Sequence, residues 1–219
     1  MRRLIWTLLF ILGSASAQPY PVKPIRIVVP LVPGGNQDIV ARAVAEELSK
    51  GLGQQVIVEN RPGQSAIIGT QFVKSAPADG YTLLSVAVTF ARVPSVVKAA
   101  GYDPAADFAG ISLVCRIPQV LVVNASHPEV PTLHEQGLTD FEDVTWNGLV
   151  APAGTPRTVL TTLHSAVARA LANPELKKKH AERGIEMVAS RSPEEFSAYV
   201  KSEADGFVKL VREAGIKVE

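Results

Sequence analysis

The sequence is short of cysteine and of excess charge, and each shortage excludes a class of protein. Its 219 residues include a single cysteine, Cys115, so neither an internal disulfide nor a multi-cysteine zinc site is possible. Lys and Arg number 22 against 21 Asp and Glu, a formal net charge of +1, so there is no basic stripe for nucleic acid. Hydrophobic residues make up 47% and charged residues 20%, which is ordinary for a globular protein.

Familiar catalytic and metal-binding motifs are also missing. The sequence has no G-x-S-x-G nucleophile elbow, no Walker loop and no G-x-G-x-x-G dinucleotide motif. Its 4 histidines include no H-x₃-H pair with a third ligand nearby. We therefore expect no metal and no cofactor. Cys115, inside an apolar run, is expected to be a small core residue.

The first 17 residues differ in character from the rest. Arg2 and Arg3 precede a short apolar run at 4–12, and 14–17 (SASA) end in a small-x-small pattern. The run is much shorter than the ~20 apolar residues that a membrane span requires. We predict a signal peptide cleaved after Ala17 and an exported chain that does not insert in the membrane. The alternative is a buried N-terminal helix.

Short apolar runs then alternate with helical patterns. Residues 25–29, 55–59 and 81–86 predict buried strands, separated by helices at about 37–50 and 67–75. Such alternation with short connections predicts an α/β fold with a mainly parallel sheet flanked by helices. Further apolar runs at 111–115 and 119–123, split by Pro118, and at 144–150 complete the set of expected strands.

The C-terminal third has clear helix boundaries. We predict Thr155 as the N-cap of a helix with Pro156 at its first position, and a capping box of Ser192 and Glu195 at the start of the last helix. Residues 124–143 have little periodicity. They are expected to form an irregular segment that is unusually long for a compact domain.

The segment 30–38 (PLVPGGNQD), between the first strand and the first helix, is the strongest candidate for a binding site. Gly34 and Gly35 allow close approach of the backbone to a ligand, and the N–H groups and dipole of the following helix favour an anion, either phosphate or carboxylate. A plain tight turn, with Asp38 favouring the helix dipole, explains the same residues. From the residues alone both interpretations stay open.

Two further loops are expected at the same edge of the sheet. One is 61–69 (RPGQSAIIG), where Gln64 and Ser65 offer side-chain hydrogen bonds, and the other is 88–90 (VTF). The carboxyl ends of parallel strands meet at one edge, which is where open α/β folds bind ligands. The common position of these loops predicts a ligand site more strongly than either loop does alone.

These segments resemble a known family. The stretch YPVKPIRIVVPLVPGGNQDIVARAVAEELSKGLGQQVIVENRPG, followed by APADGYTLL, VLVVN, EVPTLHEQGL and WNGLVAPAGTP, resembles the Bug-type substrate-binding proteins of tripartite tricarboxylate transporters. The resemblance covers nearly all of the chain after the predicted signal. It implies a periplasmic solute receptor of the type II binding-protein fold, not an enzyme. Such receptors close two α/β lobes on a small carboxylate and deliver it to a membrane permease.

The resemblance and the loop positions together predict a set of binding residues. The family usually has a glycine-rich, GAGGTIG-like run where this chain has GQSAIIG at 63–69, which puts the usual backbone contacts there in question. The expected ligand-binding residues are Val32, Pro33, Gly34, Gly35, Asp38, Gln64, Ser65, Ala66 and Thr89.

A larger departure from the family is a missing segment. In the family, the strand matching VLVVN leads into the second lobe, whereas here HP at 127–128 is followed at once by EVPT, which normally comes after that lobe. On the order of a hundred residues, a domain's worth, are therefore expected to be missing. The expected units are a signal (1–17), a first-lobe α/β domain (18–123), an irregular segment at the site of the missing lobe (124–143), and a crossing strand with C-terminal helices that pack on the first lobe (144–219).

The expected function is capture of a small carboxylate for a tripartite tricarboxylate-type permease, weakened because one lobe leaves the solute half solvated. One alternative is a non-binding remnant of such a receptor, or a chain shortened by a sequence error. A remote alternative is a small exported hydrolase that uses Ser65 or His127, for which the sequence shows no triad.

Overall fold

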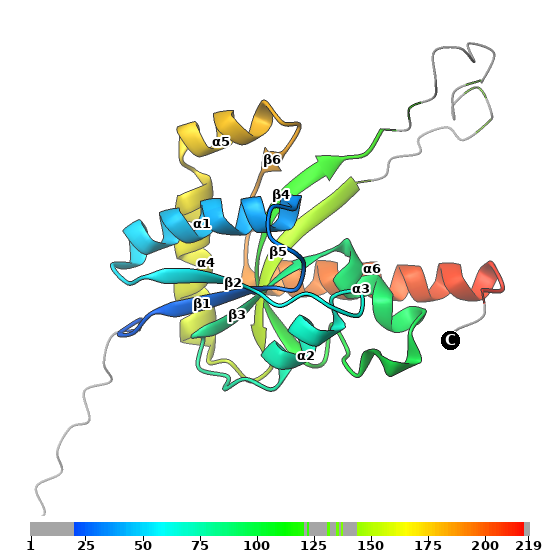
Figure 1. Ribbon diagram of the computed structural model, residues 1–219, viewed down its shortest axis with the longest axis horizontal. Helices are drawn as coiled ribbons and strands as arrows, with labels where there is room; N and C mark the ends of the chain where they lie inside the picture. Colours follow the sequence, from blue (N-terminus) through cyan, green and yellow to red (C-terminus); the bar gives the residue numbers. More distant parts are fainter. Residues whose placement is uncertain are drawn as a thin grey trace, which may run out of the picture.

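A computed structural model of the chain describes residues 20–120, 122, 131, 135, 137 and 144–216. In this part of the chain six strands form one sheet in the order β2-β1-β3-β5-β4-β6, with helices on both faces (Figure 1). The predicted signal peptide, 1–17, and almost all of the predicted irregular segment, 124–143, lie outside the described residues.

The first half of the sheet is parallel, as the alternation predicts. β1 (Ile25–Val29) pairs in parallel with β2 (Val56–Asn60) on one side and with β3 (Thr82–Ala87) on the other. The crossover helices are α1 (Asn36–Leu52) and α2 (Ile67–Lys74). Periodicity predicts these five elements well because each has a continuous apolar face and a Gly or Pro turn at its ends.

The second half of the sheet is antiparallel. β4 (Phe108–Pro118), β5 (Val144–Pro152) and β6 (Glu186–Met187) form the pairs β3–β5, β5–β4 and β4–β6, all antiparallel. The α/β fold class is confirmed, but the expectation of a mainly parallel sheet holds only for β2-β1-β3 and is corrected for the rest. Strand direction here depends on where β5 returns along the sheet, which local periodicity does not encode.

The apolar runs at 111–115 and 119–123 do not form two strands. Residues 108–118 form one long strand, and Pro118 is its last residue. A proline at the end of a strand terminates pairing because it has no N–H to donate. Residues 119 and 120 lie beyond the strand, while 121 and 123 fall outside the described residues.

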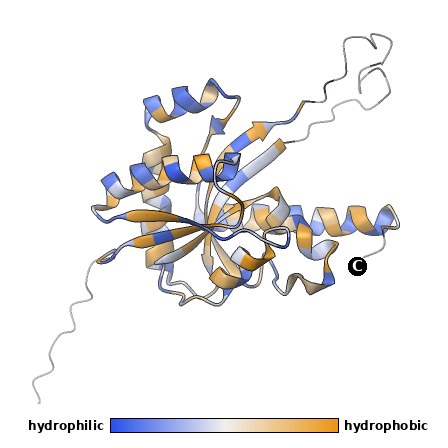
Figure 2. Cartoon of the chain, in the orientation of Figure 1, coloured by the Kyte–Doolittle hydropathy of each residue, from blue (hydrophilic) through white to orange (hydrophobic). Residues whose placement is uncertain are grey.

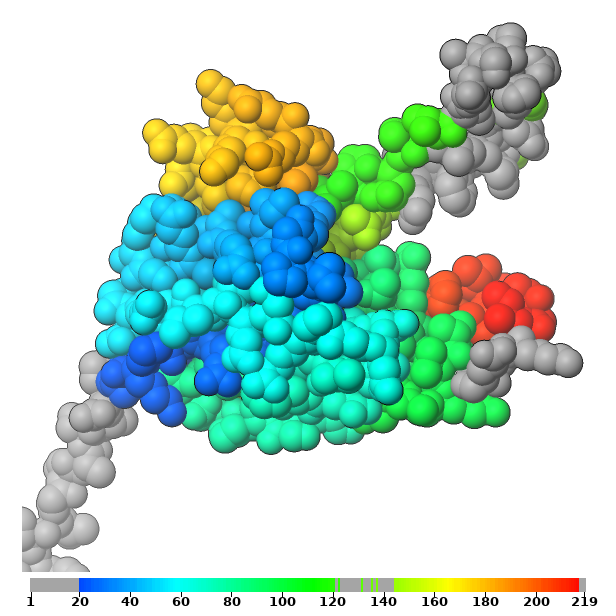
Figure 3. All heavy atoms as spheres, viewed as in Figure 1, coloured from blue at the N-terminus to red at the C-terminus, as the bar shows by residue number. Residues whose placement is uncertain are grey.

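The remaining helices are α3 (Val88–Arg92), α4 (Arg157–Leu171), α5 (Pro174–Ala181) and α6 (Pro193–Glu213), with short 3₁₀ turns η1 (Val93–Ser95) and η2 (Lys98–Ala100). α5 lies against α1 (Figure 3), where Asn173 Nδ2 donates to Glu47 Oε2 over 3.0 Å.

Two predicted helix starts have different outcomes. Thr155 is not the N-cap of α4, because its hydroxyl donates to the Pro152 carbonyl over 2.8 Å, and the N-cap is Pro156 with an extended ψ of 138°. Ser192 does cap α6, and its Oγ accepts from the Glu195 N–H over 3.1 Å. The Glu195 carboxylate accepts from the N–H of Arg191, one residue before the cap.

Two apolar cores lie on opposite faces of the sheet. One is packed beneath α1 and α4 and includes Ile27 and Leu163, and the other is packed beneath α2, α3 and α6 and includes Trp146 and Phe196. Figure 2 shows hydrophobic strands at the centre and helices with hydrophilic residues at intervals. Cys115 lies in the first core with 0% exposure, as predicted. Among the residues that the structure describes, every helix is too short or too polar to cross a membrane.

Candidate functional site

The carboxyl ends of β1, β2 and β3 meet at one edge of the sheet, here called the carboxyl edge (Figure 1). The registers place Val29 beside Asn60, and Val28 beside Leu84, so the three strands end close together. The turns leading into α1 and α2, and the start of α3, all leave from this edge. It is the position at which open α/β sheets bind ligands.

The β1–α1 turn presents free backbone donors. Residues 31–36 are all exposed, and the exposure of Val32 reaches 62%. Gly34 has a φ of +83°, a left-handed conformation that glycine adopts without strain. The N-cap of α1, Gly35, makes no side-chain cap bond, and within the described residues the N–H groups of Asn36 and Gln37 have no acceptor. Such unpaired donors at a helix N-terminus suit an anionic group.

Asp38 is buried beneath this turn, with 3% exposure. Its carboxylate accepts hydrogen bonds from the Gly34 N–H at 2.9 Å, Arg42 Nε at 3.0 Å and Asn60 Nδ2 at 2.9 Å. Burial raises the pKa of Asp38, but the hydrogen bonds from Arg42, Gly34 and Asn60 outweigh burial and hold the pKa below its usual value. The side chain therefore fixes the shape of the turn, with its oxygens directed at protein donors.

Asn60 and Arg42 complete this network. Asn60 Nδ2 also donates to the Leu31 carbonyl at 3.1 Å, and its Oδ1 accepts from Arg42 Nη2 at 2.8 Å. The β1–α1 turn is thereby tied to the last residue of β2. Sequence reasoning missed both residues. The i,i+4 spacing of Asp38 and Arg42 on one helix was an available signal, whereas Asn60 gave none.

The β2–α2 turn is strained. Gln64, Ser65 and Ala66 have φ values of 46°, 53° and 75°, three consecutive left-handed residues of which none is glycine. Each such residue costs roughly 1–2 kcal/mol relative to a right-handed conformation. Gln64 and Ser65 are exposed, while Ala66 is buried and serves as the N-cap of α2. The turn thus keeps a conformation that glycine would favour.

Gly69 brings the two turns into contact. A Cβ at this position would lie 2.8 Å from Pro30 Cβ and 2.7 Å from the Arg61 carbonyl oxygen. Only glycine fits such a separation, so the first turn of α2 packs directly against the start of the β1–α1 turn. The first two predicted loops are therefore neighbours in space.

The third predicted loop is absent. β3 ends at Ala87 and α3 begins at Val88, so Thr89 lies in the first turn of a helix, where it is exposed. The residue that joins α1 to β3 is instead Gln37, which is buried. Its Nε2 donates to the Ser85 carbonyl at 2.7 Å and to Ser85 Oγ at 3.2 Å. No feature of the sequence distinguished Gln37.

A buried amide lies at the same edge. Asn147 of β5 pairs with Ala87, the last residue of β3, and is 3% exposed. Its Nδ2 has no hydrogen-bond acceptor among the described residues. A buried donor without an acceptor costs about 1–3 kcal/mol, so this position is unusual within the fold.

The described histidines have structural partners. His164 Nε2 donates to the Ser190 carbonyl and His180 Nδ1 to the Leu176 carbonyl, each over 2.9 Å. Within the part of the chain that the structure describes, no group of three His, Cys, Asp or Glu side chains could hold a metal ion.

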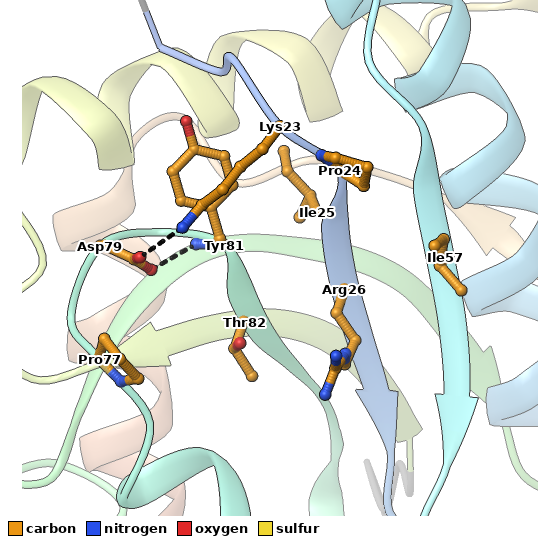
Figure 4. A pocket seen from close by; sticks show the side chains of 9 residues that line it. All are labelled: Lys23, Pro24, Ile25, Arg26, Ile57, Pro77, Asp79, Tyr81 and Thr82. Atoms are coloured by element: carbon orange, nitrogen blue, oxygen red, sulfur yellow. Dashed lines mark hydrogen bonds and ion pairs between the residues drawn. The ribbon is translucent and has the colours of Figure 1, made fainter.

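A hollow of about 310 Å³ lies at the opposite end of the sheet, by the amino ends of β1 and β3 (Figure 4). Two cations line it. Lys23 Nζ lies 3.3 Å from Asp79 Oδ2, and Arg26 Nε lies 3.2 Å from Glu59 Oε2. Because each cation already faces a carboxylate, this hollow is poorly suited to an anion.

Comparison with known sequences points to one family. A profile for the tripartite tricarboxylate transporter family receptor matches residues 40–129 and 124–216. A UPF0065 protein in the tcbD-tcbE intergenic region of Pseudomonas sp. is 26% identical over 293 residues, which cover 89% of this chain and 87% of that protein. Protein BugT of Bordetella pertussis is 40% identical over 120 residues, which cover 52% of this chain but only 36% of BugT.

Solved structures share the fold. The periplasmic binding protein BugD superposes with a TM-score of 0.80 at 24% identity, over 91% of this chain and 100% of BugD. MatC from Rhodopseudomonas palustris, solved with bound malate, superposes with a TM-score of 0.78 at 22% identity, over 88% of this chain and 100% of MatC. The profile matches span most of the sequence, and on that basis this chain belongs to the tripartite tricarboxylate transporter receptor family.

Proposed function

We propose that this protein is an extracytoplasmic receptor that binds a small carboxylate at the carboxyl edge and serves a tripartite tricarboxylate-type permease. The observation that carries the proposal is the β1–α1 turn. Its unpaired N–H donors lie at the N-terminus of α1, and the buried Asp38 network holds them in position. Family membership supports the solute class, since solved structures with this fold contain malate and adipate.

The unpaired Asn147 amide supports the same location. Asn147 pairs with Ala87 in the last pair between β3 and β5, at the carboxyl edge. It lies close to Ser85, the residue to which Gln37 donates a hydrogen bond. A donor left without an acceptor is expected where a solute or an ordered water supplies one.

The proposal includes export to the periplasm with cleavage of a signal peptide after Ala17. The pattern of 1–17 and the periplasmic relatives support this location. Mass spectrometry of the protein recovered from the periplasm checks it, with an N-terminus at Gln18 as the expected result.

We also propose that most of the second lobe is missing, with 18–123 as the first-lobe domain and 124–143 marking the place of the loss. The alignment with the Pseudomonas relative runs over 293 residues, more than the 219 in the chain, which requires a long gap within it. The profile matches in two stretches that meet at 124–129, where such a gap would fall. Residues 144–219 then form a crossing strand and C-terminal helices that pack on the first lobe.

A single lobe leaves much of the solute in water, so binding is expected to be weak, with dissociation constants of about 1 mM. Isothermal titration calorimetry against malate, adipate and citrate tests this, with the uncharged diamide of malate as the control ligand. Micromolar affinity would contradict weakened binding. If none of these carboxylates produces a heat of binding, the alternative of a non-binding remnant is favoured.

A further inference from the structure

A recess beside α6, here called the α6 recess, shares no residue with the candidate site at the carboxyl edge. Its volume is about 230 Å³, smaller than the roughly 300–1,000 Å³ of pockets that enclose drug-sized ligands. β4, the connection from β6 to α6, and α6 itself form its walls. The lining residues are Leu113, Arg116, Val188, Ala189, Ser190, Arg191, Glu195, Phe196 and Tyr199.

The floor of the α6 recess is apolar and well packed. Leu113 and Phe196 are 5% and 1% exposed and belong to the core beneath α6. The Tyr199 ring packs against this floor, with its centroid 5.4 Å from that of Trp146 and 6.5 Å from that of Phe196. A flat or short apolar group would therefore find aromatic and aliphatic contacts inside the recess.

The rim of the α6 recess has an excess of positive charge, because Arg116 and Arg191 line it with only one carboxylate, Glu195, whose charge interacts with both. Arg191 is paired with Glu195, with Nε 2.8 Å and Nη2 2.7 Å from Oε1. Arg116 is exposed, and within the described residues its guanidinium makes no hydrogen bond or ion pair. Glu186 lies opposite Arg116 across the β4–β6 pair but forms no ion pair with it and does not line the recess.

The Tyr199 hydroxyl adds a neutral donor. Burial, together with the negative charge of Glu203, raises the pKa of Tyr199 despite the nearby Arg116 and Arg92. The phenol therefore keeps its proton at neutral pH and is able to donate to an anion beside Arg116.

From this geometry we propose that the α6 recess is a second binding site, which takes a small carboxylate with an aromatic or short aliphatic body. The body lies on Leu113, Phe196 and the Tyr199 ring, and the carboxylate pairs with Arg116. Arg191 and Glu195 neutralise each other and close the outer rim. A planar guanidinium is suited to a carboxylate because two parallel N–H groups match its two oxygens.

Benzoate is the probe, and Trp146 is the reporter because its ring contacts both Tyr199 and Phe196. The chain has 2 tryptophans, and Trp6 lies in the predicted signal peptide, so the exported chain that begins at Gln18 carries Trp146 as its only tryptophan. Benzoate is expected to change Trp146 fluorescence saturably, and neutral benzamide is expected to bind at least about tenfold more weakly.

Three variants assign the site. Arg116→Gln is expected to weaken benzoate binding by about tenfold or more, while Arg169→Gln, which removes an exposed arginine of α4, leaves it unchanged. Val188→Phe, at a half-buried lining residue that packs on the same core as Leu113 and Phe196, is expected to abolish binding by filling the recess. No saturable signal up to about 10 mM benzoate would overturn the proposal. Benzoate binding that survives both Arg116→Gln and Val188→Phe would place the ligand elsewhere and would equally overturn the proposal.

Discussion

Asp38 is the side chain on which the shape of the β1–α1 turn depends. Asp38→Ala removes the acceptor of the Gly34 N–H and one of the two acceptors of Asn60 Nδ2, so the free energy of unfolding is expected to fall by about 1–3 kcal/mol. Carboxylate binding should weaken with it, because the turn loses its anchor. Urea unfolding and calorimetry measure the two effects. Asp205→Ala, which breaks only an exposed pair with Lys201, should leave both almost unchanged.

The same residue predicts a pH dependence. The pKa of Asp38 is lower in the folded protein than in the unfolded chain, despite the opposing effect of burial. Its contribution to stability is therefore fully present above the unfolded pKa of about 3.9, and is lost as the pH falls through the lower, folded pKa. As the pH is lowered from roughly 6 to 3, the free energy of unfolding should fall less steeply for Asp38→Asn than for the parent chain. Equal slopes would contradict the role of the network.

Ser65 tests the strain in the β2–α2 turn. It is exposed and has a φ of 53°, so Ser65→Gly should remove steric strain at little loss of contact. Glycine also adds flexibility to the unfolded chain, which offsets part of this gain. The unfolding free energy is therefore expected to rise by about 0.5–1 kcal/mol. Ser202→Gly, at an exposed position inside α6, should instead destabilise by about 0.5 kcal/mol. Thermal unfolding distinguishes these opposite signs.

At the scale of whole elements, α6 docks on the sheet through a glycine of β5. A Cβ at Gly148 would lie 2.1 Å from Phe196 Cζ, so Gly148→Ala must displace the aromatic ring that anchors the helix. We expect a loss of about 1–3 kcal/mol in the free energy of unfolding. Gly206→Ala, within α6 itself and with nothing within 4 Å, should stabilise by about 1 kcal/mol. Losses at both positions would contradict this packing.

At the scale of the whole molecule, Cys115 reports global unfolding. It lies in the core with 0% exposure, and burial raises the pKa of its thiol to about 11. The native chain should therefore resist a thiol reagent such as Ellman's reagent and react with one equivalent only when unfolded. Ser202→Cys, which adds an exposed thiol on α6, should react at once. Rapid labelling of Cys115 in the native state would require an opening of the sheet that the structure does not show.

Most local elements and the conformation of the β1–α1 turn could be predicted from the sequence. The strand at 25–29, the Gly34–Gly35 turn and the cap at Ser192 are encoded by neighbours a few residues apart. Hydrophobic periodicity and capping chemistry act at that range, so they predicted these features. The resemblance, carried by motifs along the whole chain, indicated the family that the profile match then established.

Contacts between distant residues decided the rest. Only the folded chain places Asn60 against Asp38, packs Gly69 on Pro30, and turns β5 antiparallel beside β3. Each of these contacts depends on where an element returns in space, a choice made by the packing of two cores and not by local propensity. The sequence by itself therefore determined most of the elements, indicated the family and singled out the β1–α1 turn as the candidate site. Tertiary structure alone decided that Asn60 joins Gly34 and Arg42 as the third donor to Asp38, since α1 and β2 meet at the carboxyl edge only in the folded chain.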